Sequence, residues 1–169
     1  MESIAQMRMD GVGKGLCRLY QGKLKDGLSV EQLADLFKGG IDFCINNDYP
    51  TLDFLREHYK GKCEPYGVYI DESTGQLHNP GTVVLNGACK AFINYNGHKV
   101  SRLYARHESE CAVVVGGAAH ITIDLFDNAH LVIAVAGSDA RVSINVYGNA
   151  RVEQKGPGIT VTHKHKNTI

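Results

Sequence analysis

The second half of this 169-residue chain repeats itself about every ten residues. Each unit begins with a small residue, and an aliphatic residue follows two positions later. The unit starts are Gly81, Ala91, Ser101, Cys111, Ala119, Ala129, Ala140 and Ala150. Within a unit, apolar and polar residues alternate, which is the period of a β-strand with one buried face. Because a single strand cannot bury that face alone, the repeat predicts stacked strands that share one aliphatic core.

Residues that favour tight turns separate these units. Asn86-Gly87, Asn96-Gly97 and Asp127-Asn128 can adopt the positive φ that such turns require. The pattern fits two architectures: a β-solenoid with two strands in each coil of about twenty residues, or an antiparallel meander closed into a sandwich or a barrel. We favour the solenoid, because the connections between hairpin strands usually vary more in length than these units do.

The residues before the repeat follow a different period. Ser29 and Gln32 match a capping box, and an apolar stripe with helical spacing follows from Leu33. The domain boundaries that we expect are a helical region over residues 1–61, a transition segment over 62–80, a β-repeat domain over 81–158 and a basic tail over 159–169. The expected fold class is therefore α+β, with a short helical region followed by a repetitive all-β part.

The composition narrows the functions that this chain can have. Its formal net charge is zero, so no strong positive field draws it to nucleic acid. The five cysteines are scattered without a CxxC pair, which indicates buried thiols in a reducing compartment and no zinc site. The first residues, MESIAQMRMDG, lack the apolar core typical of a signal peptide, so we expect none, and no run approaches about 18 apolar residues. We therefore expect a cytoplasmic protein without a membrane partner, a metal or a cofactor.

Outward-facing positions of the repeat supply a candidate ligand site. Under the solenoid interpretation, units two apart stack on the same face. One face then carries Arg102, His120 and Arg141 as a column of cationic side chains. Such a column could hold an anion, because cationic groups on a rigid sheet converge with little loss of conformational entropy.

The opposite face of the repeat supplies a candidate interface. Ala112, Val114, Val132 and Ala134 would form an apolar patch that points outward. A contiguous apolar patch of this kind needs to be covered. The N-terminal helices or a second subunit could cover it. We favour the second subunit, and hence a homo-oligomer, because the helical stripes can largely bury one another.

Two stretches resemble those of a known family. GIDFCINNDYPTLDFLREHYKGK, over residues 40–62, and IDLFDNAH, over 123–130, resemble small uncharacterised proteins carried by phages and mobile elements of gut Bacteroidetes. The resemblance covers most of the chain and implies a helical part followed by a strand-rich part, but no catalytic residues. The short hydrophobic repeats are also loosely similar to those of bactofilin-like solenoids, which polymerise. The helical N-terminal segment departs from that second pattern.

No catalytic motif stands out, so we expect a non-enzymatic interaction or assembly protein. The mobile-element setting implied by the resemblance adds an alternative, a ligand-binding inhibitor of a host defence system that takes a small anion or blocks a protein. A carbohydrate-active enzyme is a third hypothesis. That chemistry needs at least two convergent carboxylates, whereas the acidic residues of the repeat lie mostly at turns.

The repeat leads to a direct test of secondary structure. Far-UV circular dichroism of the whole chain should show mixed helix and strand, and a fragment that begins at residue 81 should show mainly strand. A mostly helical spectrum for that fragment would contradict the repeat interpretation.

Overall fold

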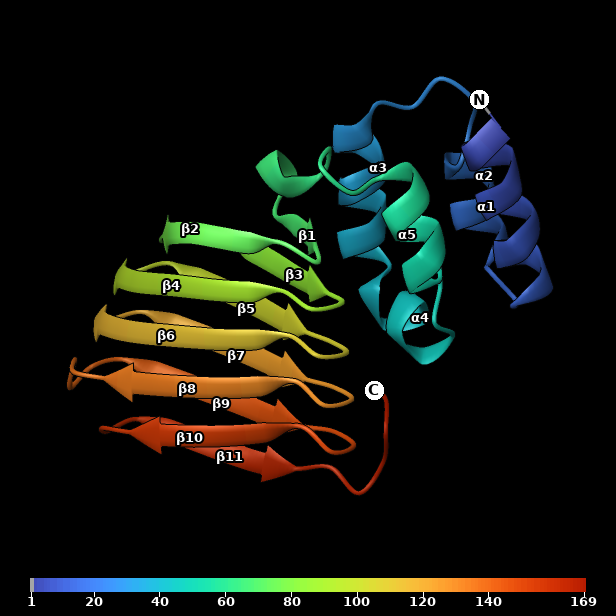
Figure 1. Ribbon diagram of the computed structural model, residues 1–169. Helices are drawn as coiled ribbons and strands as arrows, with labels where there is room; N and C mark the ends of the chain where they lie inside the picture. The colour runs from blue at the N-terminus through green and yellow to red at the C-terminus, as the bar shows by residue number, and fades with distance from the viewer. Residues whose placement is uncertain (1) are drawn as a thin grey trace. The chain divides into compact units, whose positions relative to one another are not determined.

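The computed structural model of the chain describes residues 2–169, and its elements are labelled in Figure 1. These elements form two compact units. One ends at Tyr66, and the other runs from Gly67 to Thr168. We call them the helical unit and the solenoid unit.

Two helices of the helical unit begin at a polar side chain that caps them, Ser29 and Thr51. Its elements are α1 (Glu2–Gly13), α2 (Arg18–Lys23), α3 (Val30–Gly39), α4 (Ile41–Asn46), α5 (Leu52–His58) and the 3-10 turn η1 (Glu64–Tyr66). The Ser29 hydroxyl accepts a hydrogen bond from the Gln32 N–H at 3.2 Å, and the Gln32 side chain accepts one from the Ser29 N–H at 2.9 Å. The predicted capping box is thus confirmed at the start of α3.

Among residues 2–169, no helix has the length and apolarity that crossing a membrane requires.

Strands fill the solenoid unit. They are β1 (Val68–Ile70), β2 (Ser73–His78), β3 (Thr82–Asn86), β4 (Lys90–Gly97), β5 (Val100–Ala105), β6 (Glu110–Gly117), β7 (His120–Leu125), β8 (His130–Val135), β9 (Arg141–Val146), β10 (Arg151–Lys155) and β11 (Ile159–His163). The first two strands therefore lie in the segment that we expected to be transitional, and β11 lies in the expected tail. In β11, Ile159 and Val161 are in register with the inward Val142 and Ile144, as in the repeat. In β1 it is Tyr69 that is in register with the inward Leu85, whereas Val68 and Ile70 are buried on the outward side of the strand.

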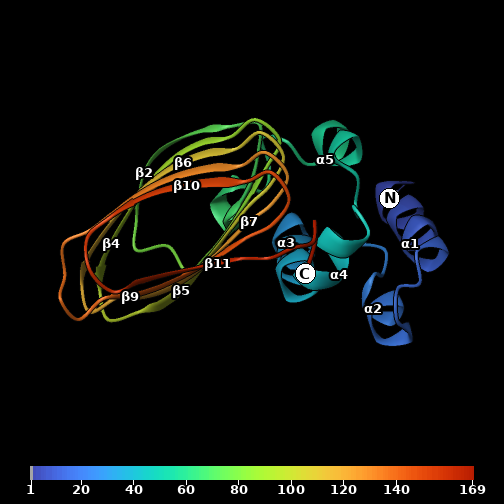
Figure 2. The same cartoon turned by 90° about the horizontal axis from the view of Figure 1, so that it is seen from below.

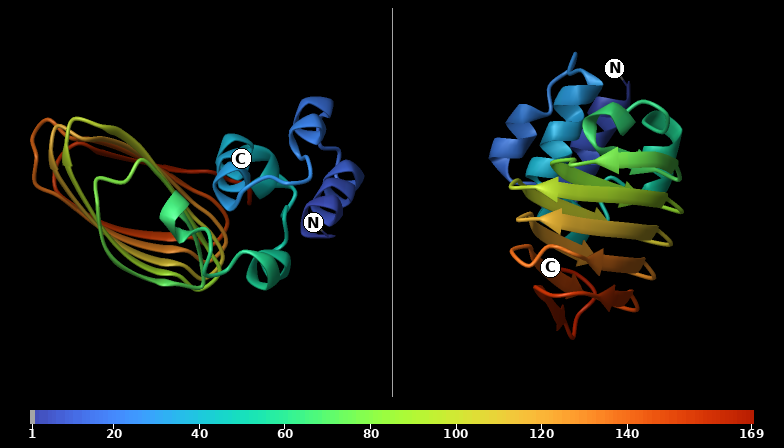
Figure 3. Two further views of the ribbon diagram at one scale, coloured as in Figure 1. Left: turned by 90° about the horizontal axis from the view of Figure 1, so that it is seen from above. Right: turned by 90° about the vertical axis from the view of Figure 1, so that its left-hand side faces the viewer.

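Successive strands alternate between two sheets. The odd-numbered strands form one sheet in the order β1-β3-β5-β7-β9-β11, which we call sheet A, and the even-numbered strands form the other in the order β10-β8-β6-β4-β2, which we call sheet B. Neighbouring strands run parallel in both. Within residues 67–168 the chain is a β-solenoid of about five coils, which excludes the antiparallel alternative. Figure 2 and the left panel of Figure 3 show the coils of this unit overlaid along the stacking direction, and the right panel of Figure 3 shows the strands stacked from the side.

The register of the strands confirms the aliphatic core and corrects the frame of the repeat. In sheet A, Val83 pairs with Leu103, Leu103 pairs with Ile123, and Ile123 pairs with Ile144, and all four side chains are buried. The central coil length is thus twenty residues, with one extra residue before Ile144. Aligned aliphatic side chains at this spacing bury one another between consecutive coils.

The correction concerns the unit starts assigned before the short step to Ala119. Ala91 pairs with Cys111 and Cys111 with Leu131, so both are inward strand positions and not the starts of units. Ser101 is in the same phase, because it pairs with Ile121. Ser109 is buried at the corner instead, one coil before Ala129. The sequence offered two small residues two positions apart, and only the register distinguishes them. With Ser109 as the start, a ten-residue spacing holds through Ala119 to Ala129.

A column of left-handed residues closes one of the two turns in each coil. Positive φ occurs at Asp71, Gly87, His107, Asp127 and Gly148, which are equivalent positions in consecutive coils. Side chains in this column accept hydrogen bonds from the backbone of a neighbouring coil. Asp71 Oδ1 accepts from the Ala88 N–H at 2.8 Å, and Asp127 Oδ2 accepts from the His107 N–H at 2.9 Å. The turns thus satisfy backbone donors that the strand ladders leave over.

Inward and outward positions of β9 give a matched pair of variants. Val142→Asp places an unpaired charge in the buried stack, which costs several kcal/mol, on the order of half of a typical total stability of about 5–15 kcal/mol. Ser143→Asp introduces the same group one residue away on the exposed side, and we expect it to cost less than about 1 kcal/mol. Urea unfolding followed by circular dichroism measures both. Equal losses would contradict the assigned phase of the strand.

Candidate functional site

The outer face of sheet B carries a contiguous apolar surface. Phe92 pairs in register with Ala112, and Ala112 pairs with Val132. In the next outward column, Val114 pairs with Ala134. Because register partners in a parallel sheet point to the same side, these five side chains form one patch. We call it the apolar strip.

The side chains of the apolar strip are open to solvent. Phe92, Val114 and Val132 expose 39%, 37% and 45% of their surface. The register brings Ala112, Val114, Val132 and Ala134 together on an outward face, as their alternation predicts. Phe92 belongs to the same patch but was not predicted, although its outward phase directly after Ala91 was a signal for it. Contiguous exposed patches of this kind are typical of surfaces that bind something.

Polar and charged side chains surround the apolar strip. At one end of the strands, Lys90 Nζ lies 3.9 Å from Glu110 Oε2, and His130 Nε2 lies 3.0 Å from Glu153 Oε1. The outer strands are polar as well. Gln76 and His78 on β2 are in register with Phe92 and Asn94, and the outward residues of β10 are Arg151, Glu153 and Lys155. An apolar centre with a polar rim is the usual composition of a protein interface.

The predicted cationic column does not form on the outer face of sheet A, because the register separates Arg102 from His120 and Arg141. His120 pairs with Arg141, but Arg102 pairs with Thr122, two residues farther along the strand. The error arises because the start assigned at Ser101 lies two residues later in its strand than Ala119 does in the next coil. Arg141 Nη1 also donates hydrogen bonds to the carbonyl oxygens of Ala140 and Ser138, at 2.8 and 3.2 Å. Anion binding at these cationic residues stays a prediction.

Several outward side chains in the rest of this face of sheet A are buried, unlike those of the apolar strip on sheet B. Tyr104 and Asp124 point outward, as their phase predicts, but both are buried. Asp124 Oδ1 accepts a hydrogen bond from Asn145 Nδ2 at 2.8 Å. Farther along, the rings of Phe126 and Tyr147 stack with centroids 4.7 Å apart, and both are buried. Tyr104, Phe126 and Tyr147 are thus out of solvent, in contrast to the apolar strip, whereas Val100 at the start of β5 is exposed.

The carboxylates of the repeat make contacts between coils. Besides Asp124 and Asp127, Glu108 Oε1 accepts a hydrogen bond from Asn128 Nδ2 at 2.6 Å, and Glu110 and Glu153 form the contacts with Lys90 and His130 given above. These acids link residues about twenty positions apart, which is one coil. Within residues 2–169, no group of three or more His, Cys, Asp or Glu residues is arranged to hold a metal ion. The carbohydrate-active hypothesis is not tested by these contacts.

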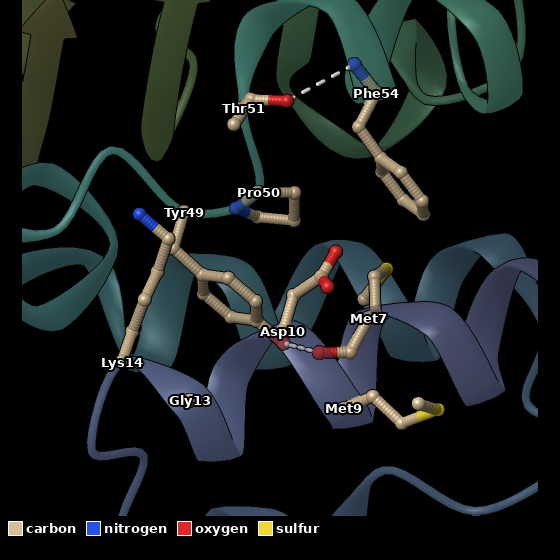
Figure 4. A pocket seen from close by; sticks show the side chains of 9 residues that line it. All are labelled: Met7, Met9, Asp10, Gly13, Lys14, Tyr49, Pro50, Thr51 and Phe54. Atoms are coloured by element: carbon tan, nitrogen blue, oxygen red, sulfur yellow. Dashed lines mark hydrogen bonds between the residues drawn. The ribbon is translucent and has the colours of Figure 1, made fainter.

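The helical unit contains a hollow of about 380 Å³, drawn in Figure 4. Its lining includes Met7, Asp10, Lys14, Tyr49 and Phe54. The Tyr49 hydroxyl donates to the Met7 carbonyl oxygen at 2.7 Å, and burial raises the pKa of this phenol well above its usual value. Lys14 Nζ donates to the Asn47 carbonyl oxygen at 2.6 Å. The polar atoms of Tyr49 and Lys14 thus hold α1 against the segment before α5.

We found no relative of this chain among known proteins. No family model, curated protein or solved structure matches the chain. The resemblances noted in the sequence stay predictions.

The cysteines differ in their accessibility, and this difference can be measured. Cys44, Cys63, Cys89 and Cys111 are buried, as we expected of scattered thiols, whereas Cys17 is exposed. Burial raises the pKa of Cys63 and of Cys111 to about 12. Both therefore stay protonated thiols at neutral pH, and a thiol is a poor nucleophile.

We expect a maleimide at pH 7.5 to label one cysteine rapidly in the native protein and all five in denaturant. Intact mass spectrometry reads the number of labels. Cys17→Ser should abolish the rapid labelling. Rapid labelling of Cys111 in the native protein would contradict its place in the solenoid core.

Proposed function

We propose that this chain is a non-enzymatic assembly protein, whose copies associate through the apolar strip of sheet B. The observation that supports this function is the exposure of Phe92, Val114 and Val132 beside one another on a rigid parallel sheet. Exposed aliphatic and aromatic side chains gain free energy when they leave water, by about 25 cal/mol for each Å² buried. A sheet face that is already ordered loses little conformational entropy on binding.

A second copy of the chain is a suitable occupant for electrostatic reasons. The formal net charge is zero, so long-range repulsion does not oppose the approach of one copy to another. The rim of sheet B carries both signs of charge, at Lys90, Glu110, Arg151, Glu153 and Lys155. An interface between identical surfaces needs such a mixture, because a rim of one sign would face itself.

The size of the face sets the expected strength of association. Sheet B has five strands. With strands about 4.8 Å apart and about 20 Å of strand length, its flat face covers about 500 Å². A standard interface buries about 800 Å² of accessible surface on each partner. We therefore expect a reversible dimer with a dissociation constant in about the micromolar range.

Placing a charge in the apolar strip tests this function. Val132→Lys should weaken self-association at least tenfold, because about 1.4 kcal/mol of lost binding energy suffices for that change. The fold should be kept, since Val132 points outward. The matched control is Val100→Lys, which makes the same change at a side chain that is 75% exposed on β5 in sheet A.

Sedimentation velocity over a wide range of protein concentration measures the effect, and circular dichroism checks the fold. The proposal expects a dimer for the wild type and for Val100→Lys, and a monomer for Val132→Lys. A wild-type mass of 18.5 kDa at every concentration would contradict the proposal. Equal weakening by the two lysines would show that the apolar strip is not the interface.

A further inference from the structure

The outward side chains of β6 and β8 alternate in size in both directions. Along β6, Ala112 precedes Val114, and along β8, Val132 precedes Ala134. Across the two strands, Ala112 is in register with Val132, and Val114 is in register with Ala134. Each valine therefore has an alanine as its neighbour along the strand and across the sheet. The centre of the apolar strip is a two-by-two pattern of two projections and two hollows.

A two-fold rotation can place this pattern against itself. If the axis lies parallel to the stacking direction and passes between the two outward columns, each strand faces the same strand of the second copy. Val114 then faces Ala112 of the second copy, and Val132 faces Ala134 of the second copy. Large side chains facing small ones pack as closely as a protein interior, whereas valine facing valine would hold the sheets apart.

The same rotation also places opposite charges of β10 against each other. Glu153 lies in the column of Ala112 and Val132, and Lys155 lies in the column of Val114 and Ala134. The rotation that seats the valines therefore brings Glu153 opposite Lys155 of the second copy. Because the contact is isologous, the pair forms twice.

The other in-plane axis is disfavoured by charge. An axis parallel to the strands, midway between β6 and β8, would also place valine against alanine. It would also bring Glu110 opposite His130. However, it would bring β4 opposite β10, so that Lys90 faces Arg151 and Phe92 faces Glu153. Like charges that face each other oppose association, and an apolar ring against a carboxylate desolvates that carboxylate without a partner. With the axis parallel to the stacking direction, Lys90 and Phe92 face the neutral residues Asn96 and Asn94.

We infer that two copies pair face to face about a two-fold axis parallel to the stacking direction, with Glu153 of each copy against Lys155 of the other. This inference rests on the proposed self-association through sheet B. It makes Glu153 and Lys155 the residues that select the orientation of the pair, while the Val and Ala side chains supply the apolar contact.

A mixing experiment tests the inference. Glu153→Lys gives a copy with two lysines at these positions, and Lys155→Glu gives a copy with two glutamates. Each variant alone opposes like charges twice, so its dimer should be about tenfold weaker than the wild-type dimer. An equimolar mixture should form a heterodimer of about wild-type strength, because opposite charges then face each other at both positions. Sedimentation velocity and native mass spectrometry read the two outcomes.

Replacing Glu153 also removes its contact with His130. A second pair of variants, on β6, leaves that contact unchanged. Ala112→Val alone places valine against Val114 of the second copy and should weaken the dimer about tenfold. The double variant Ala112→Val/Val114→Ala only exchanges projection and hollow on β6, so it should restore the dimer. With the axis parallel to the strands, the double variant would face Val132 with valine and would stay weak.

The outcomes separate the inference from the function that it rests on. If the wild type is a dimer but neither mixing nor the double variant restores the weakened dimers, the orientation is overturned and self-association stands. A wild-type monomer overturns both. Rescue in both experiments supports the pairing, and circular dichroism confirms that each variant is folded before it is compared.

Discussion

Parallel stacking in register constrains the whole solenoid unit. Each inward side chain must fit between the equivalent side chains of the coils before and after it, as Ile123 fits between Leu103 and Ile144. A polar residue at such a position would lose its hydration without gaining a partner. The strands, the twenty-residue coil and the left-handed turns can all be understood as ways of keeping aliphatic residues aligned along one axis.

The same constraint leaves the outward positions free to carry function. Since the strand period is two, every coil presents outward side chains whose identity does not affect the core. On β6 and β8 these positions hold the alanines and valines of the apolar strip, and on β10 they hold Glu153 and Lys155. The scaffold fixes the spacing of these side chains, so a binding surface on it is ordered before any partner arrives. Association can then depend on side-chain size and charge.

Alternation in the sequence identifies the direction of a side chain but not its neighbour in the next coil. It was sufficient for the buried position of Val142, for the solenoid and for the four central residues of the apolar strip. It failed for the units that were taken to start at Ala91, Ser101 and Cys111, because these residues are inward strand positions. The late frame also displaced Arg102 from His120. It also could not show that Tyr104 and Asp124 are buried, because alternation says nothing about coverage. Phe92 was missed although its phase was readable.

Removing one whole coil tests whether twenty residues form an interchangeable unit of the stack. Deleting residues 108–127 removes β6 and β7 and joins His107 to Asn128, which keeps each later strand in its own sheet and each inward residue inward. Thermal unfolding followed by circular dichroism is the measurement. We expect a shorter solenoid that keeps its strand signal and unfolds cooperatively, with some loss of stability. Loss of the strand signal or of the cooperative transition would contradict it.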